Sequence, residues 1–529
     1  MKRRNFIQTA ATGVVVPTLL QGIPMNAYSN NSILDAIVNP TVDTDHVCVM
    51  IYLGGGNDGL NTLIPLDKYA RLSAADARTK IMIPQNEILS LSGVPNTGLH
   101  PAMSGFKILF EEKKLNAIQS VGYPTPNFSH FRATDIWTSA SDSNQVVDTG
   151  WVGRYLNQEY PGFPANYPNA QNPDPLAIQV GANLPLLFQG QNAQMSMNVS
   201  NTDIFGAWPQ GINDPAPNNP FGKELSYIRT ISRQSKSYAD KLIAAYLKGN
   251  NLSNYPTGNY LADTLKVIAR VIKGGLKTRM YLVSLGGFDT HANQVVDGNK
   301  SQGTHATLLK NLSEAVLAFQ RDLEMMSLDQ RVLGMTFSEF GRRIKSNDSL
   351  GTDHGAAAPM FLFGSKVQSG VIGNSPQIPA TLTENDNLPM QYDFRSVYAS
   401  VLKDWFCISQ QSTDQVLLRN FQNLPLIKNE CSTVDIDDFN QKQNALQMSV
   451  YPNPVVHFSK INFQSSNAKT SICLFDSLGR LVKTIYEGRL SEGAKSISLE
   501  NENYKSGNYY VRIQHGDVQQ TELVQMITE

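Results

Sequence analysis

Cysteine is scarce and scattered in this sequence. The 529 residues include four cysteines, at positions 48, 407, 431 and 473, and no two of them form a C-x-x-C pair. This distribution excludes both a disulfide framework and a zinc site built from thiolates. A single bridge between Cys407 and Cys431 is left open.

An excess of charge of one sign is also lacking. The chain carries 44 Lys and Arg against 45 Asp and Glu, and no long basic run is present. The sequence therefore indicates no nucleic-acid partner. Beyond its N-terminal segment, no stretch approaches the roughly 18 to 20 apolar residues of a membrane helix. We expect a mature protein that is soluble and has no transmembrane segment.

The N-terminal segment has the features of an export signal. Residues 2–4 (KRR) are basic, residues 10–20 are weakly apolar, and residues 27–29 offer a small-residue cleavage site. Residues 1–29 are therefore predicted to be a signal peptide, cleaved near Ser29. The paired arginines followed by Phe-Ile resemble a twin-arginine signal, with an ordinary Sec signal as the alternative. Residues 30–45 are polar and are expected to form a linker.

The next part of the chain, residues 46–426, has the pattern of an α/β domain. Continuous apolar runs predict buried strands of a parallel sheet at residues 46–53, 115–121, 280–285, 331–337 and 356–364. Amphipathic patterns predict helices at residues 226–248, 261–272, 305–326 and 394–406. The strand–helix–strand succession from 280 to 337 predicts a parallel pair with a right-handed crossover. Residues 160–222, rich in Pro, Asn and Gly, predict long surface loops.

Composition changes near the end of the chain. Residues 427–447 are polar and acidic and are predicted to be a linker that is open to proteases. Residues 448–529 show short strands and turns, including a hairpin signal between 471–475 and 480–485. This segment is expected to fold as a small antiparallel β-sandwich.

Polar motifs follow the predicted strands of the α/β domain. They are residues 54–59 (GGGNDG), 286–291 (GGFDTH), 338–343 (SEFGRR) and 351–355 (GTDHG). Open α/β sheets bind ligands at the edge where their strands end, and carboxylates with imidazoles are ligands for divalent cations. We therefore predict a metal site for zinc, calcium, magnesium or manganese, with candidate ligands Asp58, Asp289, His291, Glu339, Asp353 and His354.

Plainer interpretations of these residues stay open. Asp58 could belong to a turn without chemistry, and Asp289 could cap a loop that carries a surface imidazole at His291. Glu339 could form a buried ion pair with an arginine, whereas the planar guanidinium of Arg342 suits the oxygens of phosphate or sulfate. Residues 54–59 also contain G-x-G-x-x-G, but a proline at position 65 disfavours the helix that a dinucleotide site needs.

These motifs, together with residues 129–131 (SHF) and 150–151 (GW), resemble domain-of-unknown-function family 1501 from about residue 46 to 422. That family is similar to the alkaline phosphatase and sulfatase superfamily. The resemblance implies an alkaline-phosphatase-like, mostly parallel central sheet flanked by helices, with a two-metal site. It matches Asp58 to a metal-bridging aspartate, and His354 to a late metal-binding histidine. Asp289 and His291 match an Asp-x-x-x-His pair, although their spacing here is Asp-x-His.

The sequence departs from the superfamily pattern at residues 338–341 (SEFG), where the superfamily has Ser-Asp-His-Gly. Phe340 cannot replace the histidine, so one coordination position is lost unless a residue such as His130 fills it. The resemblance places the nucleophile at a helix start after the second strand, with Ser129 as first candidate and Thr134 as second. A Cys-x-Pro-x-Arg motif is absent from the sequence, which argues against an ordinary sulfatase.

The C-terminal segment resembles the type A sorting domain of the type IX secretion system. Residues 450–454 (VYPNP), 474–480 (LFDSLGR) and 506–512 (SGNYYVR) carry this resemblance. It implies a Bacteroidetes-type bacterium, type IX secretion machinery as a partner, and removal of the domain during export. The chain ends in residues 523–529 (LVQMITE) rather than in the usual basic tail.

Together these features predict an exported metal-dependent hydrolase of phosphate or sulfate esters. Its substrate is expected to be a small anionic ester or a sulfated or phosphorylated glycan. Ser129 would be the nucleophile and Arg342 the anion clamp. The protein would pass through the periplasm and become extracellular or surface-bound. The alternative is a non-catalytic secreted surface or carbohydrate-binding protein with a degraded site. We predict that Asp58, Asp289, His291 and His354 form one cluster.

Overall fold

A computed structural model describes residues 44–181, 184–199, 216–428, 431, 446, 448–476, 480–502, 504–516 and 518–528. The chain forms two compact units, of which one spans Val42–Cys431 and the other includes Ser432–Glu529. The predicted signal peptide and nearly all of the two predicted linkers, with both predicted cleavage sites, lie outside the described residues. Each unit is therefore described by itself.

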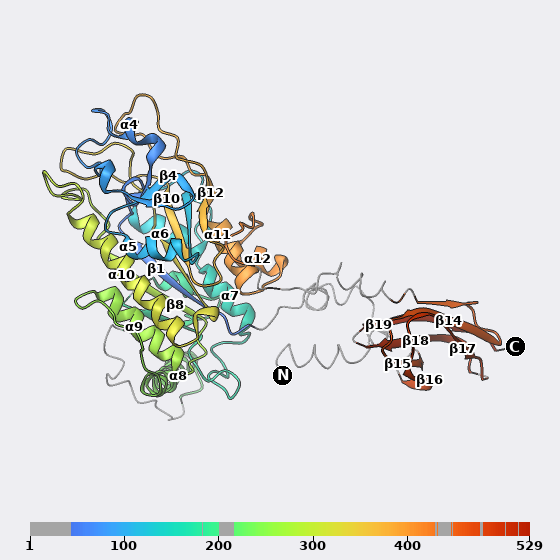
Figure 1. The fold of residues 1–529 in the computed structure, drawn as a ribbon. Helices are drawn as coiled ribbons and strands as arrows, with labels where there is room; N and C mark the ends of the chain where they lie inside the picture. The colour runs from blue at the N-terminus through green and yellow to red at the C-terminus, as the bar shows by residue number, and fades with distance from the viewer. Residues whose placement is uncertain are drawn as a thin grey trace. The chain divides into compact units, whose positions relative to one another are not determined.

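A mostly parallel sheet forms the centre of the larger unit (Figure 1). Its strand order is β11-β5-β10-β9-β1-β8-β6-β7, and β12 also pairs with β5. The pairings of β10 with β5 and β9 are antiparallel, and the others are parallel. The strands are β1 (Val47–Gly54), β5 (Leu115–Gly122), β6 (Ala177–Val180), β7 (Ser196–Val199), β8 (Met280–Gly286), β9 (Val332–Phe337), β10 (Ala358–Phe363), β11 (Gly370–Ile372) and β12 (Tyr392–Asp393).

Helices cover both faces of this sheet because β1 is apolar on both sides. Val49 and Ile51 pack into one hydrophobic cluster with helices α5, α8, α9 and α10. Cys48 and Met50, which alternate with them, pack into a second cluster with α6, α7, α11 and α12. The helices are α5 (Ser104–Glu111), α6 (His130–Ser139), α7 (Trp151–Glu159), α8 (Pro220–Lys248), α9 (Tyr260–Lys273), α10 (Thr304–Met325), α11 (Phe394–Ser400), which continues as a π-helical turn (Val401–Trp405), and α12 (Gln410–Leu417). The predicted α/β fold class is confirmed.

Shorter elements lie between β1 and α5. They are α3 (Gly59–Thr62), α4 (Tyr69–Leu72) and a small antiparallel sheet of β2 (Leu63–Pro65), β3 (Leu89–Leu91) and β4 (Val94–Leu99). A four-residue helix is too short for the helix of a dinucleotide-binding turn. The segment after residues 54–59 therefore differs from what the G-x-G-x-x-G alternative requires.

Three expectations about elements were wrong. Strands β8 and β9 are parallel members of one sheet but do not pair, because β1 lies between them. Residues 160–222 are not only loops, since they contribute β6 and β7 to the sheet. Helix α8 begins six residues earlier than predicted: Asn219 accepts a hydrogen bond from the Gly222 N–H, and Pro220 suits the first helical position.

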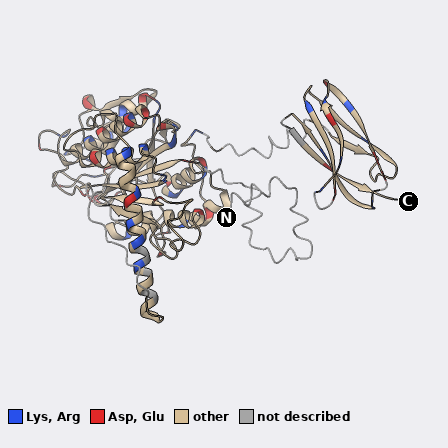
Figure 2. Cartoon of the chain, turned by 90° about the horizontal axis from the view of Figure 1, so that it is seen from below, with Lys and Arg blue, Asp and Glu red and all other residues tan. Residues whose placement is uncertain are grey.

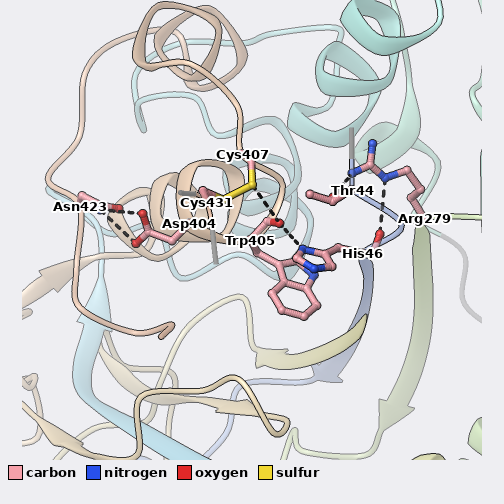
Figure 3. Close-up of a disulfide and its surroundings, with 8 residues drawn as sticks. All are labelled: Thr44, His46, Arg279, Asp404, Trp405, Cys407, Asn423 and Cys431. Carbon is pink, nitrogen blue, oxygen red and sulfur yellow. Dashed lines mark hydrogen bonds between the residues drawn. A yellow bond between two sulfur atoms is a disulfide. The ribbon is translucent and has the colours of Figure 1, made fainter. Parts of the chain in front are cut away.

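The larger unit, Val42–Cys431, is the core unit, and it is tied together at the amino end of β1 (Figure 3). Cys407 and Cys431 form a disulfide, which confirms the bridge that the sequence left open. Two residues before Cys407, the Trp405 indole donates a hydrogen bond to the Val47 carbonyl at 3.1 Å. The Trp405 carbonyl in turn accepts one from His46 Nδ1 at 2.6 Å, and the two rings stack. The first and last described segments of the unit are thus fastened at the edge opposite the strand carboxyl ends.

The C-terminal unit consists of two antiparallel sheets, ordered β13-β14-β17 and β16-β15-β18-β19. Alternating side chains such as Ile461, Ile472 and Val511 form its core. The predicted hairpin is present as β15 and β16, although residues 477–479 lie outside the described residues. The strands are β13 (Ser449–Tyr451), β14 (Phe458–Ser465), β15 (Lys469–Asp476), β16 (Leu481–Arg489), β17 (Gly493–Glu500), β18 (Gly507–His515) and β19 (Val518–Met526).

Charged side chains of both signs are interspersed over the core unit (Figure 2). This distribution agrees with the near-zero net charge of the sequence. Within the described ranges, none of the helices combines the length and apolar character needed to cross a bilayer.

Candidate functional site

Four loops meet at the carboxyl edge of the central sheet, namely those after β1, β5 and β8 and the one that joins β9 to β10. Loops that leave β1, β5, β8 and β9 start there, because these strands all run in the same direction. Strand β10 runs the opposite way, so residues 351–357, which precede it, lie at the same edge. Gly55 lets two of these loops touch: its φ is +120°, and a Cβ there would lie 2.2 Å from the Asp289 nitrogen.

Three imidazoles converge on one carboxylate at this edge. Asp289 Oδ1 lies 3.1 Å from His354 Nε2 and 3.2 Å from His291 Nε2. Its other oxygen, Oδ2, lies 3.5 Å from His130 Nε2. The Nε2 atoms of His291 and His354 are 2.9 Å apart. His130, Asp289 and His354 each offer an atom suited to ligate one ion, and these atoms all lie within 4.8 Å of one another.

The Nδ1 atom of each imidazole lies at hydrogen-bond distance from a carboxylate or carbonyl oxygen, which can accept a hydrogen bond but cannot donate one. His130 Nδ1 lies 2.9 Å from Glu339 Oε1, and His291 Nδ1 lies 3.0 Å from Asp353 Oδ1. His354 Nδ1 lies 2.8 Å from the Phe128 carbonyl. These partners assign the hydrogen to Nδ1, so each neutral ring turns an Nε2 lone pair toward Asp289. Metal-binding histidines are oriented in the same way.

Local electrostatics favour an ionised carboxylate and a neutral imidazole in the centre of the site. Burial raises the pKa of Asp289, but the hydrogen bond from Arg342 and the contact with His354 outweigh it, so that this pKa falls to about 2. Burial lowers the pKa of His354 and outweighs the effect of its contact with Asp289. Near neutral pH the site therefore offers a negative oxygen beside a free nitrogen lone pair.

Arg342 has a different place from that expected of an anion clamp. Its side chain is fully buried, and its Nε and Nη1 donate to the carbonyls of Gly56 and Thr352, each at 2.8 Å. Its Nη2 donates to Asp289 Oδ1 at 2.7 Å and also to the carbonyls of Gly55 and Phe288. The guanidinium therefore fastens the β1, β8 and β10 loops together and holds Asp289, and an incoming anion cannot reach it from solvent.

Asp58 does not join the cluster in the structure. It is buried and forms an ion pair with Arg78, and its Oδ2 accepts a hydrogen bond from Gln294 Nε2 at 2.6 Å. The pKa of this carboxyl is lowered, because Arg78 and its other partners outweigh the effect of burial. Asp58 thus stabilises the interior beneath the loops. Of the four residues predicted to cluster, only Asp289, His291 and His354 lie together.

Glu339 and Asp353 lie beside the cluster rather than within it. Glu339 is buried, and its Oε1 accepts from both His130 and the Gly55 N–H at 2.8 Å. Asp353 accepts from His291. Burial raises the pKa of Asp353, but its hydrogen bonds with His291 and Asn347 and the charge of Arg343 together outweigh burial and lower this pKa. The geometry gives both carboxylates the task of orienting imidazoles.

His130, which the sequence offered as a replacement for the histidine missing at position 340, is part of the cluster. It is the first residue of α6, directly after the loop that follows β5. Phe340, which stands where the superfamily has a histidine, is buried beneath the cluster, with its ring centroid 4.5 Å from His354 and 4.9 Å from His130.

The two nucleophile candidates differ in exposure. Ser129 is exposed at the N-cap position of α6, and its side chain forms no capping hydrogen bond. Its neighbours in the chain, Phe128 and His130, both take part in the site. Thr134 lies one turn further along α6, where its Oγ1 contacts the Tyr52 hydroxyl at 3.2 Å.

Comparisons with known families match both units. Residues 258–419 match the family described as a protein of unknown function (DUF1501). Residues 449–527 match the secretion system C-terminal sorting domain. The two resemblances predicted from the sequence are confirmed. None of the curated proteins compared with the chain matches it.

Solved structures resemble the chain only distantly. A protein in the alkaline phosphatase superfamily from Vibrio parahaemolyticus is 8% identical, with 90% of this chain and 84% of that chain covered and a TM-score of 0.34. A Bacteroides thetaiotaomicron protein, described with the metabolism of multiple glycosaminoglycans, is 9% identical, with 87% and 90% covered and a TM-score of 0.31. A Bacteroides vulgatus DUF3244 family protein with an immunoglobulin-like β-sandwich fold is 16% identical, with 15% and 81% covered and a TM-score of 0.12. Scores this low support no inference about the site.

Proposed function

We propose that the core unit is a metal-dependent hydrolase of phosphate or sulfate esters that acts outside the cell. The observation that supports this proposal most is the convergence of His130, His291 and His354 on Asp289, with the exposed Ser129 directly before His130 in the chain. The sorting domain at residues 449–527 marks the chain as a secreted, cell-surface or extracellular protein. Its substrate would accordingly be an extracellular anionic ester, such as a sulfated or phosphorylated glycan.

The donor set fits a divalent metal. His130, Asp289 and His354, with His291 beside them, would hold the ion through imidazole nitrogens and a carboxylate oxygen. A divalent ion bound there would supply Lewis-acid stabilisation of the charge that develops on the ester oxygens. Glu339, Asp353 and the Phe128 carbonyl would keep the three imidazoles in the tautomer that binding needs.

Ser129 would act as the nucleophile. At the N-cap of α6 its hydroxyl lies where unpaired backbone N–H groups and the helix dipole favour an anion. Its Oγ would form a bond to phosphorus or sulfur while its proton passes to water. The alcohol would leave as the ester bond breaks, taking a proton from water. A second water would then release the phosphate or sulfate and restore the serine hydroxyl.

Hydrolysis of model substrates tests this function. The full-length protein, supplied with Zn²⁺, is assayed against nitrophenyl phosphate, a nitrophenyl phosphodiester and nitrophenyl sulfate. We expect turnover of at least one of them. Ser129→Ala should reduce kcat by at least about 100-fold, which corresponds to about 2.7 kcal/mol of transition-state stabilisation.

Thr134→Val is the matched control, since it removes the competing hydroxyl on the same helix. It should keep kcat within a few-fold of the unmodified protein. If Thr134→Val abolishes turnover while Ser129→Ala does not, the nucleophile is Thr134. If the unmodified protein hydrolyses none of the three substrates, the hydrolase proposal fails in favour of a non-catalytic secreted binding protein.

A further inference from the structure

We propose that this site holds one divalent ion of the zinc type, through His130 Nε2, His291 Nε2, His354 Nε2 and Asp289, rather than the two ions that the sequence resemblance implies. The inference adds detail to the proposed function. It rests on that proposal only in taking the same residues as the metal site. It concerns which ion is bound and how many, and not whether an ester is hydrolysed.

The spacing of the four donor groups suits one ion. Two ligands bound to zinc at about 2.0 to 2.1 Å in tetrahedral geometry lie about 3.3 Å from each other. The separations are 2.9 Å between His291 and His354, 3.1 and 3.2 Å from these two to Asp289 Oδ1, and 3.5 Å from His130 to Asp289 Oδ2. Atoms of His130, Asp289 and His354 already lie within 4.8 Å of one another, and a rotation of the His130 or His291 side chain would be needed to bring the fourth group to the same centre.

The chemistry of the donors selects the class of ion. Three of the four donors are imidazole nitrogens, each with its Nδ1 side held by an acceptor. Calcium and magnesium prefer shells made almost entirely of oxygen, whereas zinc and related transition metals bind imidazole well. The set therefore favours zinc over calcium and magnesium.

Ligands for a second ion are engaged elsewhere. Asp58, which the resemblance assigns to bridge two metals, is buried and paired with Arg78 and Gln294. Glu339 accepts hydrogen bonds from His130 and from the Gly55 N–H. In the described part of the chain, His130, Asp289 and His354 are the one group of three or more His, Cys, Asp or Glu residues spaced to hold an ion.

An aromatic ring takes the place where another ligand would be needed. Phe340 is buried directly against His130 and His354. Its ring offers no donor atom. A second ion on this side would contact the carbon atoms of the Phe340 ring in place of a ligand. A buried charge that lacks ligands is energetically costly.

Cobalt titration tests both the number and the class of the ion. Chelator-treated full-length protein is titrated with Co²⁺ and followed by visible absorbance, because four-coordinate cobalt absorbs much more strongly than six-coordinate cobalt. We expect the absorbance to saturate at one equivalent with a four-coordinate spectrum. One equivalent of Zn²⁺ should abolish this absorbance, and a large excess of Ca²⁺ or Mg²⁺ should not.

Variants identify the ligands without relying on activity. His291→Ala should weaken Co²⁺ binding at least 10-fold and change the spectrum. His457→Ala, an exposed histidine of the other unit, should change neither. Glu339→Gln keeps a hydrogen-bond acceptor for His130 and should retain the stoichiometry with an affinity lowered about 10- to 100-fold.

Saturation at two equivalents, a six-coordinate spectrum, or displacement of cobalt by Ca²⁺ or Mg²⁺ would overturn the inference. So would a His291→Ala protein with unchanged binding and spectrum. One equivalent bound without hydrolysis of any ester would support the inference and refute only the proposed function. Hydrolysis with two ions bound would refute the inference and leave the proposed function in place.

Discussion

At the residue scale, one buried amide joins the interior of the site to its loops. Gln294 donates to Asp58 at 2.6 Å, and its Oε1 accepts from Thr290 at 3.1 Å and Thr352 at 2.8 Å. Thr290 and Thr352 neighbour Asp289 and Asp353 in the chain. Gln294 thus connects the β8 loop, the loop before β10 and the Asp58–Arg78 ion pair.

Gln294→Met should therefore destabilise the core unit. The substitution keeps the side-chain length but leaves the buried hydroxyls of Thr290 and Thr352 without their acceptor and removes one of the groups that donate to Asp58, at an expected cost of about 1 to 3 kcal/mol. Urea unfolding followed by tryptophan fluorescence measures it, since all four tryptophans of the sequence lie in residues 137–405. The exposed Gln302→Met should stay within about 0.5 kcal/mol of the unmodified protein. Equal effects of the two variants would contradict this role.

Two other buried histidines should make core stability depend on pH. Burial lowers the pKa of His100 to about 3 and of His305 to about 4, against an ordinary value near 6.5. The unfolded chain therefore takes up their protons first. Stability should be fully present above about pH 6.5 and fall below it by about 1.4 kcal/mol per pH unit for each histidine, until the folded-state pKa is reached.

Urea unfolding at pH 4.5 to 7 tests this dependence. In His100→Asn the amide oxygen can replace Nδ1 as acceptor for the Ala102 N–H, which lies 3.1 Å away. In this variant, the unfolding free energy should change with pH less steeply, by about 1.4 kcal/mol per pH unit. If the slope of the variant equals that of the unmodified protein, His100 is not the group that titrates.

The sequence predicts the part of the site whose residues directly follow or precede a buried strand. Asp289, His291 and His354 meet since each lies next to a buried strand at the same edge of the sheet. The partner of Asp58 could not be predicted, because Arg78 reaches it only through tertiary packing. The hydrogen bonds from Arg342 to several backbone carbonyls could not be predicted either, because most of these carbonyls belong to loops that are distant in sequence.

At the element scale, continuous apolar runs identify the central strands. β1, β8, β9 and β10 appear close to their predicted positions because each is buried on both faces. The order of the strands could not be predicted in this way. β1 lies between β8 and β9 because of pairing between segments far apart in the sequence, and local patterns carry no information on such pairing. The four-residue strands β6 and β7 carry too few residues to give a periodic signal.

The disulfide should stabilise the last element of the core. It links residues 24 positions apart, and closure of such a loop in the unfolded chain gives about 3.5 kcal/mol in the chain-entropy model. The double variant Cys407→Ser/Cys431→Ser should lower the free energy of core unfolding by about 2 to 4 kcal/mol, measured by tryptophan fluorescence in urea. Cys473→Ser, which removes a free cysteine of the other unit, is the control. A loss below about 0.5 kcal/mol in the double variant would contradict a stabilising role.

At the scale of the whole molecule, each unit has hydrophobic clusters of its own. Residues 449–527 match a sorting domain, which the core does not need for its packing. We predict that secreted protein has been cleaved twice, near Ser29 and between about residues 429 and 447. A cut after Cys431 leaves the disulfide within the core.

Intact-mass analysis of protein secreted by the native host measures both cleavages. A truncated chain that ends near residue 447 should fold with the same core stability but stay in the periplasm. Mature extracellular protein that still carries residues 448–529 would contradict a sorting role and indicate a permanent binding or anchoring domain.

The central claim is that the cluster around Asp289 binds the ion on which ester hydrolysis depends. It is tested most directly by adding Zn²⁺ to chelator-treated full-length protein and following turnover of the best nitrophenyl ester, with His354→Ala alongside. We predict that chelation abolishes turnover, that Zn²⁺ restores it up to a plateau at one equivalent, and that folded His354→Ala recovers less than about 1% of it, a loss of about 2.7 kcal/mol. Turnover that survives complete removal of metal, or a His354→Ala protein that recovers fully, would contradict the account.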